Sequence, residues 1–272
     1  MDYLYHYTDV DVLALILFNK TIRFNSLDNM DDLQEKEVAD IKNIGQFCYV
    51  SSWTDDPDES IAMWKMYCSW DSGVWIKIRR YPFHEFVNDP KSLITTGMPV
   101  IGDETDGDYP KSVIPYAEFI NNGFTQHPPL QKNMLFKVTY TDDKKMLYPN
   151  LVSQDEKSIN IATGMLGKYK NTYWKFQREW RYIFLAFPFD VKKIEPENDN
   201  YMRQINNKLL SGDIIHPFDY YDLTLAEEAF EDMEIMMGPG ISNGNRLIVS
   251  DLIEKYNPAA SLIESELIGK IK

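Results

Sequence analysis

The amino-acid sequence predicts an α+β fold in a single domain spanning residues 1–272, with a mostly antiparallel β core and helices packed around it. Short strand patterns alternate with helical patterns, and no regular βαβ period appears, which argues against a doubly wound parallel sheet. Hydrophobic residues make up 44% of the chain, so it has ample material for a core. The length of 272 residues allows one large domain or two unequal ones. The sequence has no internal repeats.

The expected strands are short. In residues 74–79 the apolar side chains of Val74, Ile76 and Ile78 alternate with Trp75, Lys77 and Arg79, which is typical of a half-buried strand. Residues 179–187 are apolar on both faces beyond the first turn, which is typical of a central strand. The expected strands are residues 3–8, 21–25, 47–53, 74–79, 134–140, 179–187, 234–238 and 260–267.

Capping residues mark where helices should begin. Thr8 with Asp11 makes a plausible capping pair, and Asp56, which precedes a proline, is a strong N-cap. Ser153 with Glu156 is expected to cap a longer helix. The expected helices end near residue 19, before residue 73 and near residue 175, and further helices cover residues 201–210, 225–232 and 243–256.

The periodic pattern fades over residues 82–133. Prolines at positions 82, 90, 99, 110 and 115 and the acidic run at residues 103–108 indicate loops with one short helix. We expect this segment to be an irregular insertion or a lid, and not a second domain.

The charge balance limits the kinds of partner. The chain has 28 basic and 42 acidic residues, a formal net charge of −14. The negative electrostatic potential of such a chain repels phosphate backbones and anionic lipids, so we expect no broad nucleic-acid surface and no membrane partner. A small local basic site remains compatible with this charge. The main positive cluster comprises Lys168, Lys170, Lys175, Arg178 and Arg181.

The two cysteines, Cys48 and Cys68, are too few for a disulfide framework and lack metal-binding spacing. Both lie in apolar sequence, which is typical of buried thiols in a reducing cytosol. We recognise no signal peptide and no apolar run of transmembrane length. The expected location is cytoplasmic.

Familiar catalytic signatures are absent from the sequence, and four scattered histidines give no ligand spacing, so no metal site is expected. Several residues remain as candidates, although most have an ordinary structural explanation. A carboxylate that enters an apolar strand must be paired, and Arg178 and Arg181 stand near Glu179, so a structural ion pair and a catalytic role both remain open. The candidates are His6, Tyr7, Ser51, Ser52, Trp64, Tyr67 and Glu179.

Short motifs along most of the chain, outside residues 82–133, resemble a bacterial family of uncharacterised proteins, catalogued as domain of unknown function 2971. In that family the acidic loop usually reads Asn-Asp-Pro, whereas Asp31, Asp32 and Leu33 stand here. The motifs that carry the resemblance are residues 5–8, 21–24, 30–35, 50–53, 63–67, 73–76, 179–181, 237–239 and 265–267.

That family is in turn similar to ADP-ribosyltransferases, including toxins that modify DNA bases. The resemblance implies a split β core and a cleft that holds NAD as substrate. It implies that His6 binds the adenosine ribose with Tyr7 beside it, and that Ser51 or Ser52 occupies the second motif. It implies that Glu179 is the catalytic carboxylate.

The expected reaction cleaves the nicotinamide–ribose bond of NAD and transfers ADP-ribose to an unknown acceptor, either protein, nucleic acid or water. A carboxylate facing the oxocarbenium-like transition state stabilises it more than the ground state. Aromatic residues such as Trp64 and Tyr67 suit the nicotinamide ring, and Arg23 suits the pyrophosphate. Family context adds a toxin or a phage-defence effector as the expected role. The hypothesis predicts that Glu179→Gln folds normally and loses NAD turnover.

Two other readings remain. The same fold could serve as a non-catalytic module that binds a nucleotide or a partner protein. A metal-dependent nuclease or phosphoesterase could use Asp31, Asp32 and Glu35 with Asp55 or Asp56, but the negative charge and the surface-loop character of acidic runs disfavour it.

Overall fold

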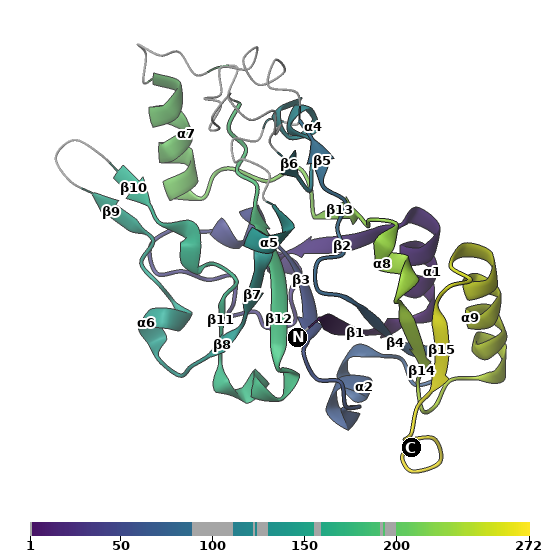
Figure 1. Ribbon diagram of the computed structural model, residues 1–272. Coiled ribbons are helices and arrows are strands. Elements are labelled where there is room, and N and C mark those ends of the chain that lie inside the picture. The colour runs from purple at the N-terminus through teal and green to yellow at the C-terminus, as the bar shows by residue number, and fades with distance from the viewer. Residues whose placement is uncertain are drawn as a thin grey trace.

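The computed structural model describes residues 2–88, 111–121, 123, 130–154, 159–190, 193 and 200–272. Its centre is a mostly antiparallel sheet of nine strands in which β13, β2, β3, β1, β4, β14 and β15 follow one another, and β12 and β7 extend from β3 (Figure 1). The strands are β1 (Tyr3–Asp9), β2 (Thr21–Ser26), β3 (Cys48–Thr54), β4 (Gly73–Arg79), β7 (Leu135–Lys137), β12 (Glu179–Leu185), β13 (Tyr220–Thr224), β14 (Glu234–Met237) and β15 (Ser261–Glu264). The predicted α+β class and antiparallel core are confirmed.

Among the described residues, three small two-stranded sheets accompany the main one. They pair β5 (Phe86–Val87) with β6 (Lys111–Ser112), β8 (Thr139–Tyr140) with β11 (Tyr169–Lys170), and β9 (Val152–Gln154) with β10 (Ile159–Ile161). The helices are α1 (Val10–Asn19), α2 (Ile61–Tyr67), α4 (Tyr116–Asn121), α5 (Gln131–Met134), α6 (Lys144–Leu147), α7 (Asn200–Ser211), α8 (Glu228–Glu231) and α9 (Asn243–Tyr256). Short 3-10 turns are η1 (Leu27–Asn29), η2 (Ile44–Phe47), η3 (Thr163–Met165) and η4 (Thr172–Gln177).

Strand β3 is the junction of the sheet. Along one edge it pairs with β12 over its whole length, from Cys48 to Thr54. Along the other edge it pairs with β2 through Tyr49 and Val50 and with β1 through Thr54. Because β2 pairs with the beginning of β3 and β1 pairs with its end, the sheet divides beside the middle of β3. That division positions the site described below.

Alternation along the strands builds two cores on opposite faces of the sheet. In β3, Tyr49 and Trp53 join the larger cluster, which α1, α8 and α9 complete. Cys48 and Val50 point the other way, into a cluster that includes Ile183 of β12. A smaller cluster of Tyr7, Trp64, Trp75 and Met236 lies where α2 covers β1 and β4. Figure 1 shows α1 and α9 beside each other near β14 and β15.

Two helix starts differ from the sequence expectation. Helix α1 is capped at Asp9 and not at Thr8, and the Asp9 carboxylate accepts hydrogen bonds from Ser69 instead of from its own helix. Helix α2 begins four residues later than expected, because the hydroxyl of Ser60 accepts from the Met63 N–H. Ser60 therefore replaces Asp56 as the cap of α2.

The expected helix ending near residue 175 was wrong. The carboxylate of Asp40 accepts from the backbone N–H groups of Leu151 and Val152, at 3.0 and 2.7 Å, and this holds the chain extended as it enters β9. Gly167 then takes a φ of 71°, which a helix does not allow. The segment forms β9, β10, η3, β11 and η4 instead. The expected capping residue Glu156 lies outside the described residues.

Strand β13 was missed because Leu223 is its only buried residue, so no alternation is visible. The expected helix at residues 225–232 is reduced to α8, since Leu225 instead forms a β-bridge with Phe83 and donates its N–H to the Lys20 carbonyl at 2.8 Å. Of the expected insertion at residues 82–133, the described part contains β5, β6, α4 and the start of α5. Within the described ranges, no helix is both long and apolar enough to cross a membrane.

Candidate functional site

A cleft of about 400 Å³ opens where β1, β2 and β3 diverge, with α1 along its rim. Its volume is within the usual range of small-molecule sites. One end is lined by charged and amide side chains from β11, η4 and β12, and the other by α1 and β2. The candidates His6, Tyr7, Arg23, Ser51, Ser52, Tyr67 and Glu179 all line this cleft.

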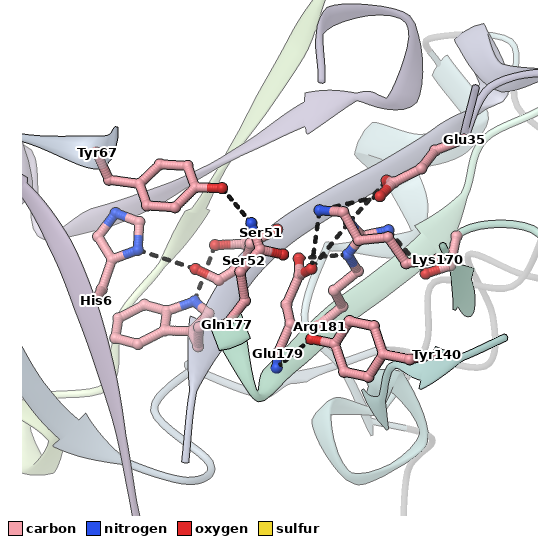
Figure 2. Close-up of polar contacts among 12 residues, drawn as sticks. His6, Glu35, Ser51, Ser52, Tyr67, Tyr140, Lys170, Gln177, Glu179 and Arg181 are labelled. Atoms are coloured by element: carbon pink, nitrogen blue, oxygen red, sulfur yellow. Dashed lines mark hydrogen bonds and ion pairs between the residues drawn. The ribbon is translucent and has the colours of Figure 1, made fainter. Parts of the chain in front are cut away.

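Four buried charges meet at the charged end (Figure 2). Lys170 Nζ lies 3.0 Å from Glu35 Oε1 and 3.2 Å from Glu179 Oε2. Arg181 Nη2 lies 2.7 Å from Glu35 Oε2, and Arg181 Nε lies 2.6 Å from Glu179 Oε1. All four side chains are at most 6% exposed. Two carboxylates and two cations cancel, so this buried charge network is neutral as a whole.

Glu179 is held as a carboxylate. Burial by itself would raise its pKa, but Arg181 and Lys170 outweigh burial and bring the pKa down to about 2, with a further hydrogen bond from the Ser52 side chain. Its backbone N–H donates to the Tyr140 hydroxyl at 2.8 Å, which fixes the start of β12. Glu179 is therefore ionised at neutral pH and cannot act there as a proton donor.

His6 approaches the same place from β1. Its Nδ1 lies 2.9 Å from the carbonyl oxygen of Ser52, so Nδ1 carries the proton and donates it. Burial lowers the pKa of His6, while the bond to Ser52 opposes this shift. The neutral ring leaves Nε2 as an acceptor. Ser52 lies beside both residues: its carbonyl accepts from His6, and its side chain helps to lower the pKa of Glu179.

Ser51 and Tyr7 contribute mainly to structure at the cleft wall. The Ser51 hydroxyl accepts from the indole N–H of Trp53 at 3.0 Å, and the Trp53 ring lies 4.9 Å from the His6 ring. The Tyr7 hydroxyl accepts from the Ser60 N–H at 3.0 Å, which ties β1 to the start of α2. Both hydroxyls are already used within the fold.

Gln177 and Tyr67 form a pair beside Glu179. The amide nitrogen of Gln177 donates a short hydrogen bond to the Tyr67 hydroxyl (Figure 2). Arg178 follows Gln177 in the left-handed region, with φ 46° and ψ 46°, and its guanidinium binds Asp55 and Asp56. Non-glycine residues rarely adopt this conformation. It ends η4 and places Gln177 and Glu179 in the same cleft while Arg178 points to the surface.

Two candidates stand apart from the expected roles. Trp64 does not line the described part of the cleft; it is 3% exposed and its indole donates to Glu59 at 2.9 Å, so it is a core residue. Arg23 lines the cleft but is paired in two places with Asp222, at 2.9 and 3.0 Å, and lies over the Tyr220 ring. A pyrophosphate would have to compete with Asp222 for it.

The sequence missed Gln177 and Lys170 as site residues. No alternating pattern indicates Gln177, because it ends η4 and the left-handed Arg178 separates it from β12. Nothing local indicates Glu35, whose partner Arg181 is far away in the sequence.

The acidic residues of the metal-site reading are dispersed. Asp55 pairs with Lys137 and Arg178, and Glu35 belongs to the buried charge network. Asp32 accepts from the Gln34 N–H at 3.0 Å. In the portion of the chain that is described, no group of three His, Cys, Asp or Glu side chains could hold a metal ion.

Comparisons with models of known protein families, with curated proteins and with solved structures found no match to this chain.

Proposed function

We propose that the chain binds NAD in this cleft and cleaves its nicotinamide–ribose bond, as an ADP-ribosyltransferase or an NAD glycohydrolase. One observation carries the proposal: His6 and Glu179, from strands β1 and β12, line one cleft together with Ser52, whose carbonyl accepts from His6. The division of the sheet beside β3 supports the split core that the resemblance to ADP-ribosyltransferases implies. The cleft volume also suits a nucleotide-sized ligand.

In the proposed reaction the bond between the ribose carbon and the nicotinamide nitrogen breaks, and nicotinamide leaves with the electron pair. The ribosyl cation is then captured by an acceptor nucleophile or by water, which loses a proton to solvent. The neutral ring of His6 offers Nε2 to a ribose hydroxyl. The ionised carboxylate of Glu179 accepts from the second ribose and stabilises the developing positive charge.

The pairing of Glu179 sets a condition on this mechanism. A carboxylate has about four acceptor sites. Arg181 supplies two donors and Lys170 supplies one. A ribose hydroxyl must therefore bind at the acceptor capacity that these cations leave, on the side that lines the cleft. The pairing with two buried cations favours a second candidate function, a module that binds NAD without cleaving it.

The first test separates catalysis from structure at Glu179. Glu179→Gln should lower nicotinamide release by about 10²–10³-fold or more, because the charge facing the sugar is lost. The pairing with Arg181 and Lys170 corrects the expectation that this variant folds normally: breaking a buried ion pair costs about 3–5 kcal/mol. Nicotinamide release and urea unfolding should be measured on the same samples.

Glu35→Gln is the matched control. Glu35 contacts the same two cations and is equally buried, but among the described residues it does not line the cleft. It should destabilise the protein to a similar extent and keep most of the turnover. Equal loss of turnover in both variants would make Glu179 a structural residue. Stabilisation of the wild-type protein by NAD without nicotinamide release would instead establish the binding module.

A further inference from the structure

One buried polar atom at the charged end of the cleft is unused. Gln177 is 4% exposed, and its amide nitrogen donates to the Tyr67 hydroxyl. Its amide oxygen Oε1 is buried and has no hydrogen-bond partner among the residues that the structure describes. Buried acceptors are nearly always paired in folded proteins, so one left open in a binding cleft indicates where a ligand supplies the donor.

The position of this amide is fixed from two sides. The Tyr67 hydroxyl on α2 holds the nitrogen, so the oxygen is the group that remains available. The left-handed conformation of Arg178, anchored by Asp55 and Asp56, holds the backbone between Gln177 and Glu179. The acceptor is therefore preorganised, and a ligand need not order it on binding.

We infer that Gln177 is a ligand-binding residue that accepts a hydrogen bond from the carboxamide NH₂ of nicotinamide and so selects NAD over its acid analogue, nicotinic acid adenine dinucleotide. This inference rests on the proposed function. A primary amide carries the N–H donor that Oε1 requires, and the Tyr67 ring and Met63 side chain line the cleft to receive a flat heterocycle.

The acid analogue, nicotinic acid adenine dinucleotide, should bind poorly beside Gln177 for two reasons. Its carboxylate has no donor at neutral pH, so Oε1 of Gln177 would face another acceptor. It would also lie near the ionised Glu179. Lys170 and Arg181 do not compensate, because each is already paired with both Glu35 and Glu179. A site built around a hydrogen bond discriminates strongly against an analogue that cannot make it.

The test compares the two dinucleotides on the full chain. The preference is the ratio of kcat/KM values if the protein cleaves them, or of Kd values if it only binds them. The wild-type protein should prefer NAD by about tenfold or more, in keeping with one hydrogen bond to a buried group. Gln177→Met keeps the unbranched shape and removes the acceptor, so the ratio should fall toward one. Gln177→Glu keeps an acceptor and should retain the preference.

Tyr67→Phe is the second variant, in case Gln177→Met does not fold. Tyr67 acts as a positioning residue, so its loss should reduce the ratio less than the loss of the amide, and a merely structural role would not change the ratio. An unchanged ratio in Gln177→Met and in Tyr67→Phe overturns the inference and leaves the proposed function intact. A wild-type protein that neither binds nor cleaves NAD overturns both.

Discussion

Two histidines illustrate how burial sets protonation at single residues. His6 is neutral in the cleft because burial lowers its pKa, and its proton is held on Nδ1 by the Ser52 carbonyl. His216 is 7% exposed, and burial lowers its pKa to about 4. Its Nδ1 accepts from the Phe218 N–H at 3.1 Å and lies 2.7 Å from the Tyr49 hydroxyl. Burial therefore keeps both imidazole rings neutral at pH 7.

This predicts an acid-sensitive stability. In the unfolded chain a histidine titrates near its ordinary value of about 6.5, so between about pH 6.5 and 4 the unfolded state binds more protons and stability falls as pH falls. From about pH 7 to pH 5, His216 alone should remove about 2 kcal/mol from the free energy of unfolding, with His6 adding in the same direction. Urea unfolding at both pH values measures the loss.

Titration of the imidazole signals by NMR checks the assignment of that loss to His216. A His216 midpoint near 6.5 would contradict it. Glu179 does not contribute to the change in stability between pH 7 and pH 5. Its pKa is lowered from 4.5 to about 2 in the folded protein, so the stability that its ionised carboxylate contributes is lost only as the pH falls below about 4.5.

At the scale of one element, α2 shows how a cap decides where a helix begins. Asp56 and the proline after it look like a helix start, yet the Asp56 carboxylate pairs with Arg178 Nη1 at 2.9 Å. The chain stays non-helical until Ser60, whose hydroxyl caps Met63 while its N–H donates to the Tyr7 hydroxyl. Helix α2 therefore begins where β1 can hold it, and this places Tyr67 at the cleft.

Ser60→Ala should lower the free energy of unfolding by about 1 kcal/mol, because the Met63 N–H loses its capping partner. Ser60→Thr keeps the hydroxyl and should retain most of the stability. Chemical denaturation of the two variants measures the difference, and equal stability would show that Ser60 does not cap α2.

At the scale of the whole molecule, aromatic packing ties the divided sheet together. Phe24 of β2 is fully buried, and its ring lies 5.5 Å from Phe83, 5.5 Å from Phe184 and 6.4 Å from Tyr182. These contacts join β2 to β12, which are not neighbours in the sheet. The walls of the cleft therefore depend on the same core that holds β12 in place.

Phe24→Ala should cost about 3–5 kcal/mol, the usual range for removing a buried aromatic side chain. Phe18→Ala on α1 is the control, since Phe18 is 66% exposed and its loss should cost less than about 1 kcal/mol. Thermal or urea unfolding of both variants measures the contrast. Similar losses would mean that Phe24 does not join the parts of the sheet as described.

The sequence alone predicted the elements whose signals are local. Alternation located β4, an apolar run located β12, and helical periodicity located α9 with the bounds that the structure has. These patterns depend on neighbouring residues facing one environment, so a single segment contains the information. The helix expected from Ser153 does not form, because the Asp40 carboxylate binds the backbone of this segment instead. Asp40 lies more than a hundred residues earlier in the sequence, so no local pattern indicates this contact.

The candidate site likewise contains features that the sequence predicted and features that only the tertiary structure decided. The sequence identified Glu179 as a carboxylate that needs partners, because an unpaired charge in an apolar strand is costly. Of the two nearby arginines that the sequence offered, the structure pairs Arg181 with Glu179, whereas Arg178 pairs with Asp55 and Asp56. Only the tertiary structure added Lys170 and, through the two cations, Glu35. Ion pairs and amide contacts act through space over a few ångströms, whereas periodicity acts along the chain. The chain could therefore specify which residues are buried, but the meeting of β1, β3 and β12 determined what they face.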